Sequence, residues 1–375
     1  MRFLEEFRDP ELARGLLEGI RGLARDMGQV RLMEVCGTHT VSIFRHGIRG
    51  LLPENVRLLS GPGCPVCVTP RGFLDQAINL AQHPQVTLVS FGDMMRVPGS
   101  RSSLERERAD GKDIRVAYSP LDALQVARQN PGRLVVFLGV GFETTAPAVA
   151  ATLLRARAEA IRNFSVLGAH KRVVPAMEAI LGGEELCLDG FICPPHVSAI
   201  IGSSPYRVLA GAWKVPCVIT GFEPLDILQG IHMLLRQILK GEHKVEVQYR
   251  RAVPPEGNPS ALRIMGEVFQ VEDSLWRGLG NIPGSGLEIR ERLSCWDARR
   301  VFQMELAPLE DPPGCCCGEV LRGVMEPSGC KMFGTSCTPQ KPLGPCMVSS
   351  EGACAAHFKY GGSPRGQGLA DGQPV

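Results

Sequence analysis

Three groups of cysteines could carry out most of the chemistry in this sequence of 375 residues. The chain holds 14 cysteines, and seven of them lie between Cys315 and Cys354. From Cys317, the pattern C-x12-C-x6-C-x16-C runs through Cys330 and Cys337 to Cys354. Four thiolates bind either zinc or an iron–sulfur cluster, and zinc sites favour paired C-x2-4-C hooks, which are missing from this pattern. The spacing therefore favours a 4Fe–4S cluster over zinc.

The second group is the pair Cys64 and Cys67 in Gly61-Pro62-Gly63-Cys64-Pro65-Val66-Cys67. This loop follows a predicted strand at Val56–Ser60 and precedes a predicted helix at Arg71–Gln82. The C-x-x-C spacing is typical of dithiol/disulfide exchange, because two intervening residues let both sulfurs meet across one turn. It could also supply half of a zinc site, or belong to a tight turn whose cysteines merely pack. The glycines and prolines favour a preorganised redox or metal site.

The third group is Cys36 with His39, in Met33-Glu34-Val35-Cys36-Gly37-Thr38-His39-Thr40. This segment leads from a predicted strand into a predicted helix, which is where open α/β sheets bind ligands. The start of a helix favours a thiolate, so Cys36 is a candidate ligand or nucleophile. His39 is a candidate proton partner or second ligand. The alternative is a buried cysteine beside an N-capping Thr38.

A fourth segment, Gly139–Pro147, also follows a predicted strand. Its glycines and Thr144 allow a phosphate-binding interpretation. However, it lacks the third glycine of G-x-G-x-x-G and the lysine of a P-loop, so nucleotide binding is disfavoured. Glu143, expected to face the cleft, is the more notable candidate. Three remaining cysteines are predicted to be buried small apolar residues, Cys187, Cys217 and Cys295.

Short apolar runs at regular intervals predict the strands that must position these residues. They are Val30–Val35, Val56–Ser60, Val86–Phe91, Ile114–Tyr118, Leu134–Leu138, Phe164–Leu167, Gly190–Cys193 and Val215–Thr220. Helix-like segments lie between most of them, namely Arg71–Gln82, Leu121–Gln129, Thr144–Arg162 and Leu225–Leu239. Alternating helices and nearly continuous apolar strands favour buried parallel sheets.

Asn130-Pro131-Gly132 interrupts this rhythm midway, which favours two sheets of four strands over one sheet or barrel. We therefore predict an α/β protein with two similar parallel-sheet domains and a Cys-rich C-terminal iron–sulfur domain. The first domain, 1–125, carries Cys36 and the Cys64/Cys67 pair, and the second covers 126–240. The C-terminal 4Fe–4S domain, 241–375, ends in a Gly-rich tail that predicts disorder.

Composition excludes several classes of function. The net charge of +2 gives no general attraction to nucleic acid or to an anionic membrane. The N-terminus mixes acidic and basic residues, unlike a signal peptide, and no run of about 18 apolar residues could span a bilayer. We therefore expect a cytoplasmic protein, in which cysteines serve as metal ligands or redox groups more often than as structural disulfides.

Four motifs together resemble the HypD family of NiFe-hydrogenase maturation factors. In chain order they are Cys36-Gly37-Thr38-His39-Thr40, Gly61-Pro62-Gly63-Cys64-Pro65-Val66-Cys67, Gly141-Phe142-Glu143-Thr144-Thr145-Ala146-Pro147 and Cys346-Met347-Val348-Ser349-Ser350-Glu351-Gly352-Ala353-Cys354. They span nearly the whole chain, and their order makes the resemblance specific. It implies two related α/β domains and a third domain that holds a 4Fe–4S cluster.

The resemblance also implies a function as an assembly scaffold. With the small partner HypC, such proteins assemble the Fe(CN)2(CO) unit that finally reaches the NiFe-hydrogenase large subunit. HypE, a more transient partner, supplies cyanide from a C-terminal thiocyanate. Cys36 matches the family's iron-binding cysteine, and Cys64 and Cys67 match its redox-active pair. The family's cluster ligands fall on Cys317, Cys330, Cys337 and Cys354, while Cys315, Cys316 and Cys346 are additional and leave room for ligand ambiguity.

Two other classes of function remain open at this stage. A cluster-dependent thiol–disulfide oxidoreductase would use Cys64, Cys67 and the C-terminal cysteines, but it would leave the Cys36 motif unexplained. A non-catalytic scaffold with a structural metal would hold zinc rather than iron, and it would tolerate replacement of Cys64.

Overall fold

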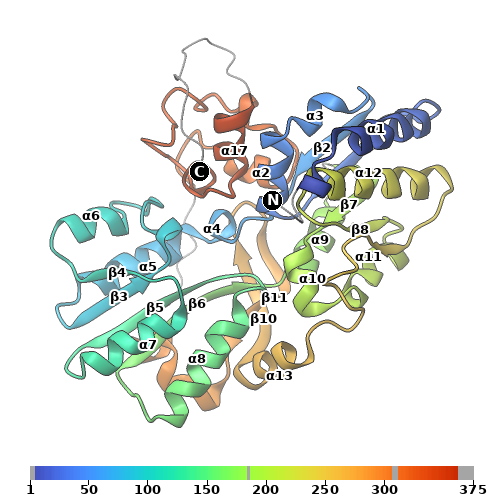
Figure 1. Ribbon diagram of the computed structural model, residues 1–375. Helices are drawn as coiled ribbons and strands as arrows, with labels where there is room; N and C mark the ends of the chain where they lie inside the picture. The colour runs from blue at the N-terminus through green and yellow to red at the C-terminus, as the bar shows by residue number, and fades with distance from the viewer. Residues whose placement is uncertain (1–4, 184–185, 306–310, 362–375) are drawn as a thin grey trace.

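The structure is a computed structural model that describes residues 5–183, 186–305 and 311–361, and it forms two α/β lobes with a Cys-rich region above their junction (Figure 1). The first lobe is built on a five-stranded, fully parallel sheet. Its strands are, in spatial order, β2 (Val56–Ser60), β1 (Val30–Glu34), β7 (Gly190–Cys193), β8 (Cys217–Ile219) and β9 (Val245–Val247).

The second lobe is built on a six-stranded mixed sheet. Its strands are, in spatial order, β10 (Phe269–Trp276), β11 (Gly280–Ile289), β6 (Phe164–Lys171), β5 (Leu134–Gly141), β3 (Val86–Ser90) and β4 (Ile114–Val116). The last four strands of this order are parallel, whereas the β10–β11 hairpin is antiparallel and lies along one edge. The predicted α/β class with two parallel-sheet domains and a Cys-rich C-terminal region is therefore confirmed.

All eight predicted strands are present, but the predicted grouping into two consecutive sets of four is wrong. β1 and β2 pair with β7–β9, while β3–β6 form the other sheet, so neither sheet follows the expected domains 1–125 and 126–240. The region from 241 onward also contributes β9, β10 and β11 to the two sheets. Apolar runs reveal which segments are buried, but they carry no information about which strand each one joins.

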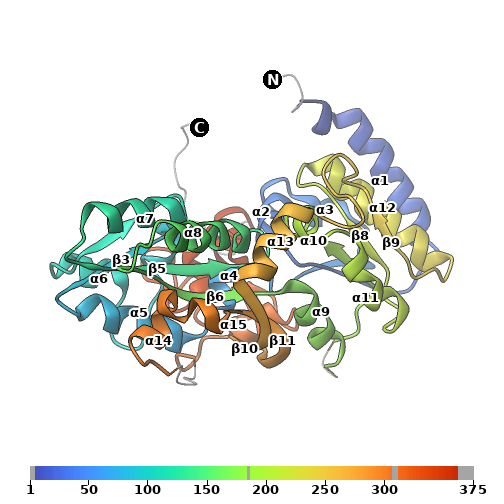
Figure 2. The same ribbon diagram turned by 90° about the horizontal axis from the view of Figure 1, so that it is seen from below.

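Helices cover both faces of each sheet, as buried parallel strands require (Figure 2). The first lobe carries α1 (Pro10–Ala24), α2 (Gly37–Arg45), α3 (Ile48–Leu51), α9 (Val173–Leu181), α10 (Pro195–Ile201), α11 (Arg207–Gly211) and α12 (Pro224–Leu239). The second carries α5 (Arg71–Gln82), α6 (Leu104–Ala109), α7 (Pro120–Gln129), α8 (Ala146–Ala158), α13 (Pro259–Val268) and α14 (Ala298–Val301).

The Cys-rich region contains only short helices, α15 (Cys317–Leu321), α16 (Pro345–Val348) and α17 (Ala353–Tyr360). One further short helix, α4 (Pro65–Val68), lies between the lobes (Figure 1). Short 3-10 helices occur at Glu5–Phe7, Gly92–Met94, Ser204–Tyr206, Glu291–Trp296 and Pro327–Gly329. The predicted disordered tail lies almost entirely outside the described residues.

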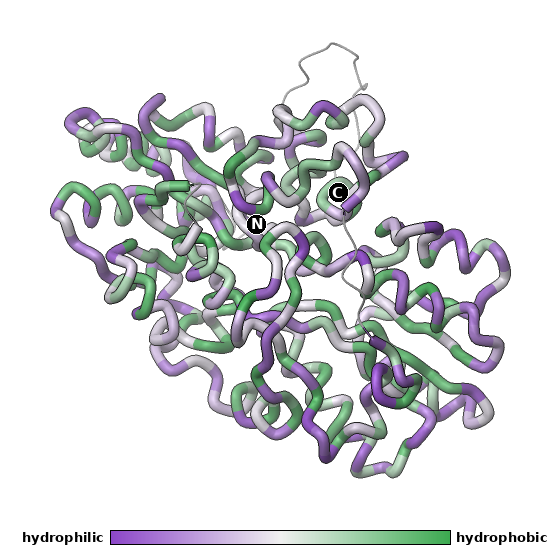
Figure 3. Tube along the Cα trace, turned by 180° about the vertical axis from the view of Figure 1, so that it is seen from behind, coloured by the Kyte–Doolittle hydropathy of each residue, from purple (hydrophilic) through white to green (hydrophobic). Residues whose placement is uncertain are grey.

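One of three clusters of buried hydrophobic residues in the described chain joins both lobes and the Cys-rich region. It contains Met33 and Val35 from the first sheet, Val136 and Leu138 from the second, and Met347 with several cysteines from the Cys-rich region. Hydrophobic segments run through the interior of both lobes, whereas hydrophilic residues gather on outer helices and loops (Figure 3). The position of the Cys-rich region is therefore fixed by apolar packing against both lobes.

The chain passes between the lobes several times. It leaves the first sheet after β2, returns to it at β7, and enters the second sheet again at β10. The Cys64–Cys67 loop lies on the first of these passages, between β2 and β3. None of the helices in the described ranges combines the length and the hydrophobicity needed to span a membrane.

Candidate functional site

Cys36 lies where the strand order of the first sheet changes direction. β1 has β2 on one side and β7 on the other, so the loops after β1 and β7 leave the sheet toward opposite faces. In open parallel sheets, the crevice at such a point is the usual ligand site. Cys36 stands two residues after β1, in extended conformation, and is the N-cap residue of α2. The predicted strand-to-helix junction is therefore confirmed.

The loop that carries Cys64 lies directly against the main chain at Cys36. The amide of Gly61 donates to the carbonyl of Glu34 at 2.8 Å, and the amide of Gly37 donates to that of Gly63 at 3.0 Å. A Cβ atom added to Gly63 would collide with the backbone nitrogen and Cα of Cys36. Only a glycine lets the two loops approach this closely, so the Gly-Pro-Gly sequence is explained by the contact it permits.

Cys64 and Cys67 form a disulfide with their Cα atoms 5.2 Å apart. Cys64 is the N-cap of α4 and accepts a hydrogen bond from the Cys67 amide at 3.1 Å, and Pro65 occupies the first helical position. The expectation that this turn brings both sulfurs within bonding range is thus confirmed. Both cysteines are buried, at 3% and 0% exposure, so the disulfide lies beneath the surface.

The imidazole of His39 is turned away from the cysteines, toward the loop between β8 and α12. Its Nε2 lies 3.0 Å from the carbonyl oxygen of Gly221 and 3.0 Å from the hydroxyl of Thr220. Its Nδ1 is buried without a hydrogen-bond partner in the described part of the chain. Burial lowers the pKa of His39 to about 4, although hydrogen bonding to the backbone of Gly221 and Thr220 acts to raise it. The ring is therefore neutral at pH 7. The proton-partner role of His39 remains a prediction.

The environment of Cys36 opposes the thiolate that its helix position suggested. Burial and, to a lesser extent, the carboxylate of Glu351 raise the pKa of the Cys36 thiol to about 12. The backbone groups of His39 and Thr38 act to lower the pKa, but their effect is smaller than that of burial. Desolvation therefore outweighs the helix dipole here, so the helix N-terminus does not by itself stabilise a thiolate at Cys36.

Glu143 follows β5, where the order of the second sheet also changes direction. Its carboxylate accepts hydrogen bonds from the amide of Val173 at 3.1 and 3.3 Å, and it lines a cavity of about 970 Å³ together with Arg172 and Phe269. Burial raises the pKa of Glu143 to about 7, although backbone amides and the charge of Arg172 act against the shift. The structure thus places Glu143 at a cavity, and gives it a pKa suited to proton transfer near neutrality.

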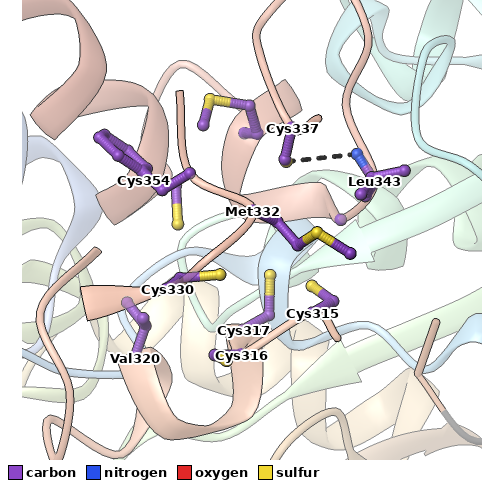
Figure 4. A pocket seen from close by; sticks show the side chains of 12 residues that line it. Cys315, Cys316, Cys317, Val320, Cys330, Met332, Cys337, Leu343 and Cys354 are labelled. Atoms are coloured by element: carbon purple, nitrogen blue, oxygen red, sulfur yellow. Dashed lines mark hydrogen bonds between the residues drawn. The ribbon is translucent and has the colours of Figure 1, made fainter. Parts of the chain in front are cut away.

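The four predicted cluster ligands surround one small apolar cavity in the Cys-rich region. Cys317, Cys330 and Cys354 point toward one another across it, and Cys337 lies at its edge, where its sulfur accepts from the amide of Leu343 at 3.4 Å (Figure 4). Cys315 and Cys316 line the same cavity, and the rest of the lining is mostly apolar, Val320, Met332, Phe333, Leu343, Gly344 and Met347.

This donor set fits an iron–sulfur cluster in its chemistry. Several soft thiols meet within an apolar shell that limits water, as an iron–sulfur cluster requires. The sulfur of Cys317 interacts with those of Cys315, Cys346 and Cys354. Cys346 is fully buried and belongs to the same group of thiols, so the ligand ambiguity noted from the sequence persists in space.

The Cys-rich region also contacts the first two groups of cysteines. The hydroxyl of Thr38 donates to the carboxylate of Glu351 at 2.8 Å, and a Cβ atom on Gly37 would collide with Glu351. Helix α16 packs on α4, and α17 packs on α2. Cys36, the Cys64–Cys67 disulfide and the C-terminal cysteines are therefore carried by elements that meet at one junction.

Sequence reasoning missed two charged residues at this junction and misjudged two cysteines. Glu351 acts on Cys36 across more than three hundred residues of sequence, and Arg277 is a buried cation beside the C-terminal cysteines. No local pattern marks Arg277, and the motif that contains Glu351 does not reveal its contact with the Cys36 loop. Cys217 is buried as expected, but Cys187 and Cys295 are exposed. That expectation was wrong because it rested on the average behaviour of cysteine and not on neighbouring residues.

The fold and the cysteines define a two-lobed α/β protein with a thiol site at a sheet switch point and a Cys-rich cap. A family model described as "HypD: Hydrogenase formation hypA family" matches residues 11–361. The chain belongs to the HypD family, as the four motifs indicated.

Three curated relatives support this assignment. "Hydrogenase maturation factor HypD2" of Bradyrhizobium diazoefficiens is 48% identical over 96% of this chain and 97% of its own length. "Hydrogenase maturation factor HypD" of Rhodobacter capsulatus is 48% identical over 97% and 99%. The protein of the same name in Azotobacter vinelandii is 49% identical over 96% and 97%. The similarity extends across both lobes and the Cys-rich region.

The contact between Gly63 and Cys36 leads to a first prediction. We expect Gly63→Ala to lower the free energy of unfolding by about 1–3 kcal/mol, because the new methyl group overpacks the site. The matched control is Gly15→Ala in α1, where a Cβ meets no atom within 4 Å, and it should be neutral or stabilising by about 0.5–1 kcal/mol. Urea denaturation measures both, and equal stability of the two variants would contradict the argument.

Proposed function

We propose that this chain acts in NiFe-hydrogenase maturation as the scaffold on which, together with HypC, the Fe(CN)2(CO) unit is assembled. HypE is the transient cyanide donor, and the hydrogenase large subunit receives the finished unit. The observation that supports this most is the common junction of Cys36, the Cys64–Cys67 disulfide and the C-terminal cysteines. Family membership and the names of the relatives point in the same direction.

Cys36 is the residue we assign to the iron that receives the ligands. Low-spin iron bound to cyanide and carbon monoxide is soft and favours thiolate anchors. The pKa of Cys36 is raised, so the thiol is protonated until a metal displaces its proton. Metal binding at this position is then accompanied by proton release, and the nearby carboxylate of Glu351 is a candidate acceptor.

The Cys64/Cys67 pair supplies electrons for cyanide release in this proposal. A thiocyanate R–S–CN and two thiols give R–SH, cyanide with one proton, and one disulfide, so two electrons pass from the thiols to the S–CN bond. The C-terminal cysteines would hold a 4Fe–4S cluster, which would pass electrons one at a time from an external one-electron donor. Two such electrons and two protons convert the disulfide back to the dithiol. Glu143, at the cavity beside Arg172, and His39, in the helix that follows Cys36, are assigned as proton donors or acceptors.

The role of Cys36 can be tested by infrared spectroscopy. Cys36→Ala should abolish the cyanide and carbon monoxide bands of the anaerobically purified complex with HypC, because the iron loses its thiolate. The C-terminal cluster should keep its visible absorption. Cys187→Ala, at an exposed cysteine, is the control and should retain the bands. Bands that survive in Cys36→Ala would place the iron elsewhere and favour a thiol–disulfide oxidoreductase.

The redox role of the pair predicts a second set of outcomes. Cys64→Ser and Cys67→Ser should each stop hydrogenase maturation while leaving the fold, the cluster and HypC binding intact, since serine keeps the size of the side chain. Thiol counting should find two fewer free thiols after mild oxidation of the wild type, and no such loss in either variant. Cys295→Ser is the exposed control. Normal maturation by both variants would reject the redox role.

The cluster is tested by metal and sulfide analysis. Anaerobic protein should contain about four irons in the cluster and show broad visible absorption. Cys330→Ala or Cys337→Ala should remove both and destabilise the Cys-rich region, because metal binding and folding are coupled there. Cys346→Ala shows whether this buried thiol can act as a ligand. Stoichiometric zinc without sulfide in the wild type would argue for a structural metal site instead.

A further inference from the structure

Arg277 lies in the tight turn between β10 and β11, at the junction of the three groups of cysteines. Its amide donates to the carbonyl of Val68, the residue after Cys67, at 2.9 Å. The next residue, Gly278, has a φ of +79°, and a Cβ there would lie 2.6 Å from the Cα of Gly318. The turn is therefore wedged between the disulfide-bearing helix α4 and helix α15, which begins at Cys317.

The side chain of Arg277 is a buried cation with too few partners. The residue is 4% exposed, and its Nε forms an ion pair with the carboxylate of Asp311 at 2.6 Å. That contact lacks hydrogen-bond alignment, and all three nitrogens of the guanidinium are without a hydrogen-bond partner among the described residues. A buried charge is costly unless it is paired and hydrogen-bonded, so five N–H donors in this position call for an acceptor.

The neighbours of the guanidinium identify the chemistry of that acceptor. The turn that carries Arg277 packs through Gly278 on Gly318, the residue after Cys317. The ion-pair partner of Arg277, Asp311, lies four residues before Cys315, and the positive charge also acts on the thiols of Cys315 and Cys346. Four thiolates around an iron–sulfur cluster carry net negative charge, and their sulfur atoms accept hydrogen bonds. An anionic cluster would provide the acceptors that the guanidinium lacks.

We propose that Arg277 is a positioning residue for the cluster, with its guanidinium placed to hydrogen-bond cluster sulfur and to stabilise the negative charge added by one-electron reduction. This inference rests on the proposed function, because it requires the cluster. Net charge and hydrogen bonds to sulfur are two of the factors that set a cluster's reduction potential. Arg277 therefore holds the potential above the value that the thiolates alone would give.

Asp311 allows a test in which two variants move the potential in opposite directions. The midpoint potential is measured by a mediated titration with dithionite, monitored by electron paramagnetic resonance of the anaerobic full-length chain. Arg277→Gln should shift the one-electron equilibrium at least tenfold toward the oxidised cluster. This corresponds to a midpoint potential lower by about 59 mV or more. Asp311→Asn should raise the potential, because the positive charge is then no longer balanced. Arg277→Lys, which keeps the charge, should remain close to the wild type.

Arg299→Gln is the matched control. Arg299 is a partly buried arginine that also has a carboxylate partner, Glu288 at 3.1 Å, but it lies on α14 against the second sheet. Its replacement should leave the potential unchanged. If the wild type lacks iron and sulfide, the proposed cluster fails, and this inference fails with it.

If the wild type holds the cluster but Arg277→Gln and Asp311→Asn both titrate like the wild type, only the role of Arg277 is overturned. Should Arg277→Gln fail to assemble the cluster, Asp311→Asn decides the matter, and an unchanged or lowered potential in that variant rejects the proposal.

Discussion

The close approach of two main-chain segments, at Gly63 and Cys36, is the constraint on which the rest of the site depends. No side chain fits between them, and hydrogen bonds from Gly61 and Gly37 hold the two loops in register beyond the ends of β1 and β2. Because both loops follow neighbouring parallel strands, the sheet itself brings Cys36 and Cys64 to one edge. The Cys-rich region then closes over this edge through Glu351 and helix α16.

Burial dominates the electrostatics of the candidate site residues. Desolvation raises the pKa values of Cys36 and Glu143 and lowers that of His39, while the buried Arg277 guanidinium has no hydrogen-bond partner in the described residues. Each of these groups is therefore held in a state that a bound metal, ligand or partner would change. Binding of a metal, ligand or partner would change the protonation or hydrogen bonding of these groups strongly, because the apolar surroundings keep them uncharged or unpaired.

The sequence predicted the elements well and their assembly poorly. β2, β7 and α5 have the predicted bounds, since apolar runs and turn residues mark them locally. The partners of each strand could not be predicted, because β1 pairs with β7 across more than 150 residues and no periodicity encodes that choice. The four candidate ligands do line one cavity, but the roles of Arg277 and Glu351 could not be predicted, since they depend on tertiary contacts.

The repeated passage of the chain between the lobes has a consequence for synthesis on the ribosome. The first sheet begins at β1 but needs β7, β8 and β9, and the second needs β11, so neither sheet can be completed until the chain has reached beyond Val245 and Gly280. β1 and β2 therefore wait with an open edge beside β1 while more than a hundred further residues emerge. During that interval Cys64 and Cys67 lack the Cys-rich region that later covers them. The nascent chain thus exposes, over a long stretch of synthesis, two thiols that the mature protein buries.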